Sequence, residues 1–114
     1  MLNRVDIMGR LTRDPELRYT QNQTAVANFT LAVDRNAKDQ PTDFIDCVAW
    51  RTTAEFISKY FRKGRMAIVS GRLQIRSYED QSGRKQKAAE VVVENIYFGD
   101  SKKPDEEEEL PFDL

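Results

Sequence analysis

The sequence predicts an all-β fold with a single helix, and three observations lead to this. Apolar and polar residues alternate over five stretches, which is the period of a half-buried strand. One short stretch instead spaces Ala54, Ile57 and Phe61 three and four residues apart, which is the period of a helix. The segment Asp80-Gln81-Ser82-Gly83 separates the last two alternating stretches and is typical of a hairpin turn with a late glycine.

The five predicted strands cover residues 3–11, 25–33, 44–50, 66–78 and 87–98. In the first strand one face carries Val5, Ile7 and Leu11, and Asp14-Pro15 then breaks the alternation. In the second strand the shared apolar face consists of Ala27, Phe29, Leu31 and Val33. In the fifth strand Val91 and Val93 lie on one face.

The helix is predicted over residues 53–63. Thr52 and Glu55 form a capping-box pattern, in which the two side chains satisfy free backbone N–H groups of the first turn. Gly64 follows two basic residues and fits a C-terminal stop. Five strands with a helix between the third and the fourth are the layout of a five-stranded OB-fold barrel. A small α+β sandwich has the same elements and stays open.

Strand periodicity places aromatic and basic side chains on one surface. The third strand directs Ile45, Cys47 and Ala49 to an inner face, and its outer face carries Phe44, Asp46, Val48 and Trp50. The fourth strand has an apolar face of Ala67, Val69, Gly71, Leu73 and Ile75, and an opposite face of Arg72, Gln74, Arg76 and Tyr78. Aromatic rings beside cations are what the binding of unpaired nucleic acid requires. The alternatives are a core position for Phe44 and Trp50, a solvated face for the arginines, and a barrel cap for Tyr78.

The composition excludes several kinds of site. The chain has no histidine and a single cysteine, Cys47, so neither a Cys/His zinc site nor an internal disulfide framework can form. No Gly-rich phosphate loop is present, and we expect no cofactor and no metal. There is no apolar run of membrane-spanning length and no signal-peptide pattern, so the expected location is cytoplasmic.

The net charge of −1 is unevenly distributed. Six of the 19 acids fall in residues 104–114, which hold no base, so the rest of the chain has 18 bases and 13 acids. A body of net charge +5 favours a polyanionic partner. We therefore expect a folded domain over residues 1–99 and a short linker with an acidic tail over residues 100–114. The tail carries Asp105, Glu106, Glu107, Glu108 and Glu109, followed by Leu110, Pro111 and Phe112.

Several ordered motifs resemble the bacterial single-stranded DNA-binding proteins. They are Gly9-Arg10-Leu11-Thr12-Arg13-Asp14-Pro15-Glu16-Leu17-Arg18-Tyr19, Ala25-Val26-Ala27-Asn28-Phe29, Arg62-Lys63-Gly64, Gly71-Arg72-Leu73, Arg76-Ser77-Tyr78 and Glu90-Val91-Val92-Val93. The resemblance covers residues 1–98 and the tail tip. It implies a non-enzymatic OB barrel, assembled as a homotetramer, that binds and protects single-stranded DNA without reading its sequence. The implied setting is replication, recombination and repair at the nucleoid.

The resemblance also assigns roles to individual residues. It implies base stacking on Phe44, Trp50 and Tyr78, and contacts to the DNA backbone from Arg4, Arg10, Arg72 and Arg76. The acidic tail ending in Leu110, Pro111 and Phe112 would dock onto replication, recombination and repair proteins.

Three features depart from the family pattern. Ala37 stands where the family often has another stacking aromatic, in an arm over residues 36–42 that is short. The linker is a handful of residues instead of a long Gly-, Gln- and Pro-rich segment. Asp113 and Leu114 follow Phe112, so the expectation is that Phe112 docks without a terminal carboxylate. These departures resemble the accessory, plasmid or phage versions of the family.

Two other functions are weighed against DNA binding. An OB-fold adaptor for replication restart or for RNA would use the same surface, and no residue reveals whether a 2′-hydroxyl is preferred. A carboxylate-based metal nuclease would need Asp6, Asp46 and Glu79 to come together. Their spacing and their placement on alternate faces disfavour that site.

Overall fold

The computed structural model describes residues 1–100, which form six strands and one helix. The elements in chain order are β1 (Val5–Leu11), β2 (Glu16–Tyr19), β3 (Ala25–Val33), β4 (Asp43–Trp50), α1 (Arg51–Tyr60), β5 (Met66–Glu79) and β6 (Lys85–Phe98). The five predicted strands are all present within one or two residues of their expected bounds.

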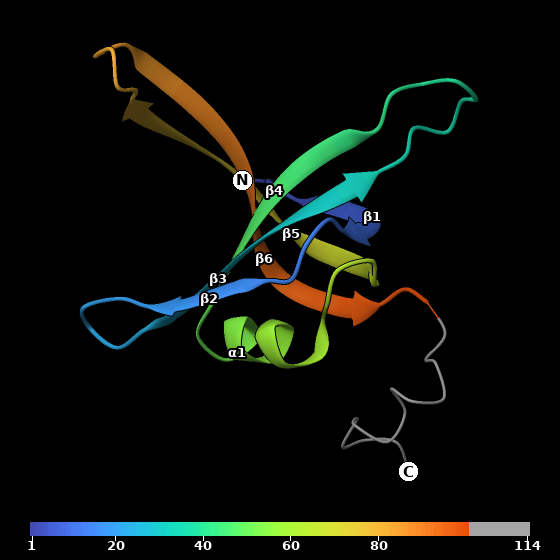
Figure 1. Ribbon diagram of the computed structural model, residues 1–114, viewed down its shortest axis with the longest axis horizontal. Helices are drawn as coiled ribbons and strands as arrows, with labels where there is room; N and C mark the ends of the chain where they lie inside the picture. Colours follow the sequence, from blue (N-terminus) through green and yellow to red (C-terminus); the bar gives the residue numbers. More distant parts are fainter. Residues whose placement is uncertain (101–114) are drawn as a thin grey trace.

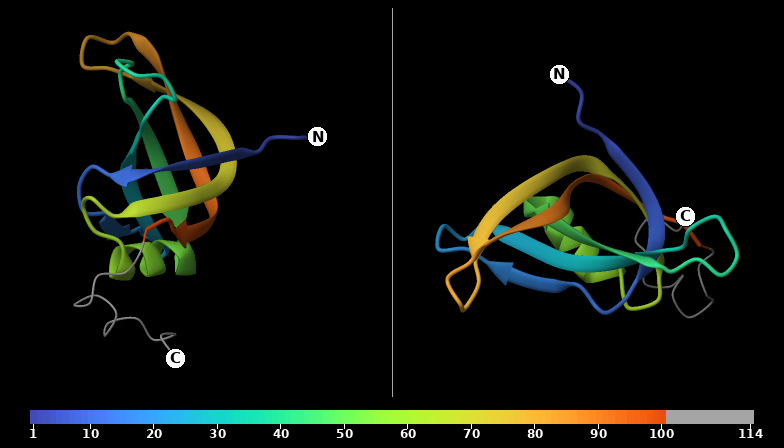
Figure 2. Two further views of the ribbon diagram at one scale, coloured as in Figure 1. Left: turned by 90° about the vertical axis from the view of Figure 1, so that its right-hand side faces the viewer. Right: turned by 90° about the horizontal axis from the view of Figure 1, so that it is seen from above.

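Five of the strands close into a barrel (Figure 1). Their order is β1-β5-β6-β4-β3, and β1 pairs again with β3 to complete the ring. All pairs in this ring are antiparallel except β4 with β6. The α1 helix lies across one end of the barrel, and two hairpin arms, β3–β4 and β5–β6, project from the other (Figures 1 and 2). This arrangement confirms the predicted OB-fold barrel.

The sixth strand, β2, was not predicted. It is four residues long and pairs only with β3, from Glu16 opposite Asn28 to Tyr19 opposite Ala25. Alternation cannot be recognised over so few residues, and Pro15 directly before the strand indicates a turn. The finding matters for the site because β2 widens the sheet beside β3.

The barrel core is formed by the inner faces that alternation predicts. Phe29, Leu31 and Cys47 are almost completely buried, as are Val69 and Val91. Burial, helped by the nearby charges of Asp46 and Glu90, raises the pKa of the Cys47 thiol to about 12. Since a thiol with that pKa stays protonated at neutral pH, Cys47 acts as a small core residue and not as a nucleophile.

The helix buries the expected face but begins differently from its prediction. Ala54, Ile57 and Phe61 are fully buried, and the Phe61 ring stacks on Phe98 with 4.7 Å between the centroids. The helix starts at Arg51, and its N-cap residue, Trp50, makes no side-chain cap hydrogen bond. The predicted capping box at Thr52 and Glu55 is therefore wrong.

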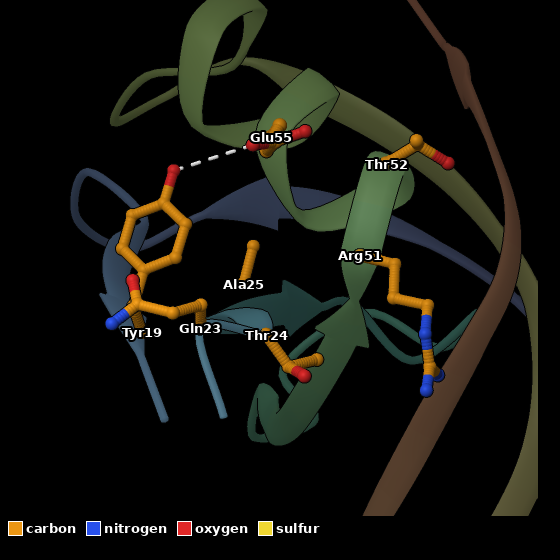
Figure 3. Close-up of a pocket in the computed structure, with 7 residues that line it drawn as sticks. All are labelled: Tyr19, Gln23, Thr24, Ala25, Arg51, Thr52 and Glu55. Atoms are coloured by element: carbon orange, nitrogen blue, oxygen red, sulfur yellow. Dashed lines mark hydrogen bonds between the residues drawn. The ribbon is translucent and has the colours of Figure 1, made fainter. Parts of the chain in front are cut away.

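Glu55 contacts strand β2 instead of the backbone of its own helix. Its carboxylate accepts a hydrogen bond from the Tyr19 hydroxyl at 3.3 Å (Figure 3). Tyr19 and Glu55 line a small hollow of about 240 Å³ between the β2–β3 turn and the start of α1. The contact fixes the edge strand β2 to the helix, which is a tertiary interaction that local capping patterns do not reveal.

The predicted helix stop at Gly64 is also wrong. The helix ends at Tyr60, and Phe61 already has an extended backbone, with its ring packed on Phe98. Gly64 lies in the turn that follows, with φ +88°, and its N–H donates to the carbonyl of Leu11 at 2.8 Å. The left-handed φ explains the glycine at this position.

The β5–β6 arm extends well beyond the barrel (Figure 1). Within it, Leu73 and Ile75 were expected on a buried apolar face, but both side chains are about half exposed. They continue the inner face of β5 past the point where opposite strands still cover it. Alternation reports the face of a residue but not whether the barrel still encloses that face.

A dense set of hydrogen bonds closes the tip of this arm, as the turn sequence predicts. The Asp80 carboxylate accepts from the hydroxyl and N–H of Ser82, from the N–H of Arg84 and from the Gln86 amide. These hydrogen bonds, with the Ser82 hydroxyl first, lower the pKa of Asp80 from its ordinary value. Gly83 supplies the left-handed residue of the turn, with φ +82°.

The arm joins the barrel at a β-bulge between Ser70 and Gly71. A Cβ atom on Gly71 would lie 2.0 Å from the carbonyl oxygen of Val92. Only glycine allows the β6 backbone to approach this closely, so the bend that carries the arm away from the barrel depends on Gly71.

Candidate nucleic-acid interface

Cross-strand pairing shows which side chains share the outer face of the sheet. Trp50 lies opposite Val26 on β3, and Phe44 lies opposite Ala32. Val48 pairs with Val92 on β6, and Val92 pairs with Arg72 on β5. Paired residues point to the same side, and so do residues two apart on one strand. Phe44, Trp50 and Tyr78 therefore lie on one continuous outer face that spans β4, β6 and β5.

All three aromatic rings reach solvent from this face. The exposed fraction is 67% for Phe44, 40% for Trp50 and 44% for Tyr78. The core alternative for Phe44 and Trp50 is therefore wrong. Val48, predicted on the same face, is buried at 6% exposure, because it sits between Asn28 and Val92 in the middle of the sheet. The rings thus stand apart on the surface instead of forming one cluster.

The two arginines of β5 lie on this face but already have protein partners. Arg72 donates to the Gln74 side chain at 2.8 Å. The Arg76 Nε lies 3.4 Å from the Glu90 carboxylate, and its guanidinium is 5.6 Å from the centroid of the Tyr78 ring. The Arg76 guanidinium thus packs near the Tyr78 ring, and the Glu90 carboxylate offsets part of the positive charge of Arg76.

Arg10 shares a row with Phe44, since both pair with Ala32 from opposite sides. A groove of about 670 Å³ runs along this row between β1 and the β3–β4 arm. The Arg10 guanidinium donates to the Gly64 carbonyl at 2.9 Å and lies 3.7 Å from Asp100. Arg10 therefore has both a structural role and a position in the same cross-strand row as the exposed Phe44 ring.

Arg4 directly precedes β1. It donates to the Ser70 hydroxyl at 2.7 Å, and its Nε is 3.4 Å from Asp6. The structure thus places Arg4 beside the β1–β5 pair. Because Val5 pairs with Gly71, Arg4 comes next to Arg72 in the register of these two strands.

Side-chain hydrogen bonds connect the two sides of the β3–β4 arm just beyond the end of β3. Arg35 contacts Asp43 through two hydrogen bonds, of 2.9 and 3.1 Å, and this contact lowers the pKa of the Asp43 carboxyl. Thr42 donates to Asp34 across the same hairpin. Ala37 lies in the loop beyond these hydrogen bonds. Residues 36–42 include no aromatic residue, so this loop carries no ring.

The carboxylates considered for a nuclease do not meet. Asp6 contacts Arg4, Asp46 accepts from the Thr30 hydroxyl at 2.9 Å, and Glu79 lies at the end of β5. Within residues 1–100 no group of three Cys, Asp or Glu side chains is placed to hold a metal ion. In the same part of the chain, no helix has the length and apolar character needed to cross a membrane.

The predicted tail falls outside the described residues. This applies to Asp105, Glu106, Glu107, Glu108, Glu109, Leu110, Pro111 and Phe112. The structure describes the chain as far as Asp100, whose carboxylate accepts from Arg65 and from the N–H of Met66.

Two cations beside Trp50 were missed by the sequence reasoning. Arg18 on β2 pairs with Val26, which pairs with Trp50, so all three lie in one row of the outer face. Arg51 directly follows Trp50. Arg18 could not be placed because β2 was not predicted, and the backbone angle that directs Arg51 has no sequence signal.

Comparison with known proteins shows which family the chain belongs to. Residues 2–99 match the model of the single-strand binding protein family. The chain is 54% identical over 102 residues to the single-stranded DNA-binding protein of Halalkalibacterium halodurans, covering 86% of this chain and 61% of that protein. It is 52% identical over 102 residues to single-stranded DNA-binding protein A of Bacillus subtilis, covering 86% and 59%.

A third relative extends further along the chain. The single-stranded DNA-binding protein of Enterococcus faecalis is 48% identical over 111 residues, which cover 94% of this chain and 59% of that protein. The chain spans about 60% of the length of the curated relatives it matches. It belongs to the single-strand binding protein family.

Proposed function

We propose that this chain binds single-stranded DNA without reading its sequence and protects it, as a non-enzymatic protein of replication, recombination and repair. The observation that carries the proposal is the set of three exposed aromatic rings on one continuous face, with arginines on the same face. Every base has a flat π-face, so stacking accepts any sequence. The names of the relatives support the same ligand.

The proposal predicts a particular pattern of binding to fluorescently labelled strands. Unpaired DNA of different sequences should bind with similar affinity, and matched duplex should bind far more weakly because its bases are already stacked. Affinity should fall with salt, with a log–log slope of about −0.7 for each phosphate contacted. Anisotropy titrations at several salt concentrations measure this, with an RNA strand of the same sequence as a comparison. Preference for one sequence, or tighter binding of the duplex or the RNA, would contradict the proposal.

The assembly we propose is a homotetramer. Met8, Ile68 and Tyr97 lie in one row across β1, β5 and β6, because Ile68 pairs with both of the other residues. Their exposed fractions are 54%, 36% and 56%. A contiguous apolar row on the surface of a soluble domain is typical of a protein interface. Trp50 lies on β4, outside this row, whereas Met8 and Phe44 line the same groove.

The acidic tail is proposed to recruit other replication, recombination and repair proteins. Asp105–Glu109 would be attracted to basic pockets, and Leu110 and Phe112 would be the apolar anchors. The same charges can compete with DNA for the basic body. Deleting residues 105–114 should therefore leave DNA affinity equal or higher at low salt and abolish partner capture. Calorimetry against a replication or repair protein from the same cell tests this, and undiminished binding by the deleted form would reject the role.

A further inference from the structure

Trp50 has Arg18 in its cross-strand row and Arg51 next to it in the chain. Neither the family resemblance nor the stacking model assigns a role to these two arginines. On one side the outer-face row runs from Trp50 through Val26 to Arg18. Two strand spacings separate the ends of this row, which is roughly 10 Å between Cα atoms. Val26, in the middle of the row, is fully buried.

Directly after Trp50 the backbone itself directs a second arginine. Arg51 has a φ of +59°, a left-handed value that a residue with a Cβ adopts uncommonly. Arg51 is one of the residues that line the hollow beside Tyr19 and Glu55, and its guanidinium points away from both of those side chains (Figure 3). Backbone strain of this kind clusters at functional sites. Tyr19 neighbours Arg18 on β2, so Arg51, which directly follows Trp50, is directed away from that strand.

Both arginines are available for a ligand. They are exposed, and within residues 1–100 neither side chain makes a hydrogen bond or an ion pair. Arg4, Arg10, Arg72 and Arg76, in contrast, each contact an acceptor of the protein. A phosphate that binds one of those four must compete with that acceptor, whereas a phosphate at Arg18 or Arg51 displaces only water and counterions.

We propose that Arg18 and Arg51 are a phosphate clamp around Trp50, holding the DNA backbone on both sides of the nucleotide that stacks on the indole. This rests on the proposed binding of single-stranded DNA and specifies its path. The strand crosses the sheet from β2 over β3 and β4 toward β6, roughly at right angles to the protein strands. Neither arginine touches a base edge, so the clamp adds affinity without sequence preference.

The first test uses salt dependence with the full chain and a labelled oligo-dT. Arg18→Ala should reduce the magnitude of the log–log salt slope by about 0.7, the value for one lost phosphate contact on a single strand. It should also weaken binding about tenfold, as expected for one charge-assisted hydrogen bond. Arg18→Lys should keep the slope, because it keeps the charge.

Arg13→Ala is the matched control. Arg13 is an exposed arginine without a side-chain partner in residues 1–100, and it lies in the turn between β1 and β2, outside the row of Trp50. Its loss changes the net charge by the same amount, and the slope should stay at the wild-type value. An equal reduction for Arg13→Ala and Arg18→Ala would reject the clamp, because general charge would then explain the effect.

The second test separates binding from folding at Arg51. Arg51→Gly removes the guanidinium and also relieves the left-handed strain, because glycine adopts positive φ without steric cost. The melting temperature should be equal to or above wild type, while affinity for oligo-dT falls about tenfold. A melting temperature that falls with the affinity would make Arg51 a structural residue and overturn its place in the clamp.

The failure of the clamp differs from the failure of the proposed function. If the wild-type chain does not bind oligo-dT at all, the function is wrong. If wild type binds, and Arg18→Ala and Arg51→Gly bind with the same affinity and salt slope, the function stands and the clamp is wrong.

Discussion

Replacing Trp50 by alanine is expected to weaken the binding of single-stranded DNA by about 1–3 kcal/mol, which is the range for one stacked base. The indole lies on the outer face of β4 at 40% exposure, with Arg18 in the same cross-strand row and Arg51 next in the chain. Removing it takes away the stacking platform but leaves the cations. The salt slope should therefore stay close to wild type while the affinity falls by roughly tenfold to a hundredfold.

Anisotropy of a labelled oligo-dT measures this loss, since the variant has no tryptophan of its own. Trp50→Phe should recover most of the affinity, because phenylalanine keeps a flat aromatic face. Tyr19→Ala is the matched control: its ring is 53% exposed, but it faces α1 and contacts Glu55 instead of lying in the outer-face row. If Tyr19→Ala weakened binding as much as Trp50→Ala, the assignment of the interface to the outer face of β4 would be wrong.

The second large effect is expected for the apolar row of Met8, Ile68 and Tyr97. Changing both Ile68 and Tyr97 to glutamine should convert the assembly to a single chain at micromolar concentration. Each side chain is partly exposed in the single chain, so the barrel should tolerate both changes. In the assembly, however, the amide groups would be buried without designed partners, at a cost of roughly 1–3 kcal/mol for each unsatisfied group.

Light scattering gives the mass in solution, and circular dichroism confirms that the barrel remains folded. Tyr19→Gln removes a ring of similar exposure from β2 and should keep the wild-type mass. Two results would count against the proposed interface: a wild-type chain that is already monomeric at micromolar concentration, or a doubly substituted chain that keeps its full assembled mass.

The outer face of β4 could be read from the sequence because strand alternation has a period of two. Phe44 and Trp50 were correctly directed outward, and Cys47 and Ala49 inward, without knowledge of the neighbouring strands. Alternation is a local property of the backbone, and it holds wherever a strand has one covered side. The same reasoning placed Tyr78 and Arg76 together on β5.

The wrong burial predictions share one cause. Whether a strand face is buried depends on where the neighbouring and opposite strands end. Leu73 and Ile75 have the alternation of core residues but lie on an arm beyond the barrel, so they stay half exposed. Val48 has the alternation of a surface residue but is covered by its neighbours on β3 and β6. A sequence read by itself does not give the lengths of the strands on the opposite side of the barrel.

The parts of the interface that were missed depend on pairing and backbone angle. Arg18 joins the row of Trp50 only because the four-residue β2 pairs with β3 in one particular register. Arg51 has a left-handed φ, a conformation that is normally expected at glycine and therefore was not predicted at an arginine. The capping box failed for a related reason, since Glu55 hydrogen-bonds to Tyr19 on a strand that was not predicted.

The most direct test of the central claim is a titration of the intact chain with poly-dT, following the fluorescence of its single tryptophan. Trp50 is half-exposed on the proposed stacking surface, so a base placed on the indole should quench the emission strongly and saturably. A matched duplex should quench it little at the same concentration. Emission that stays unchanged when poly-dT binding is saturated would show that no base stacks on Trp50 and would contradict the account.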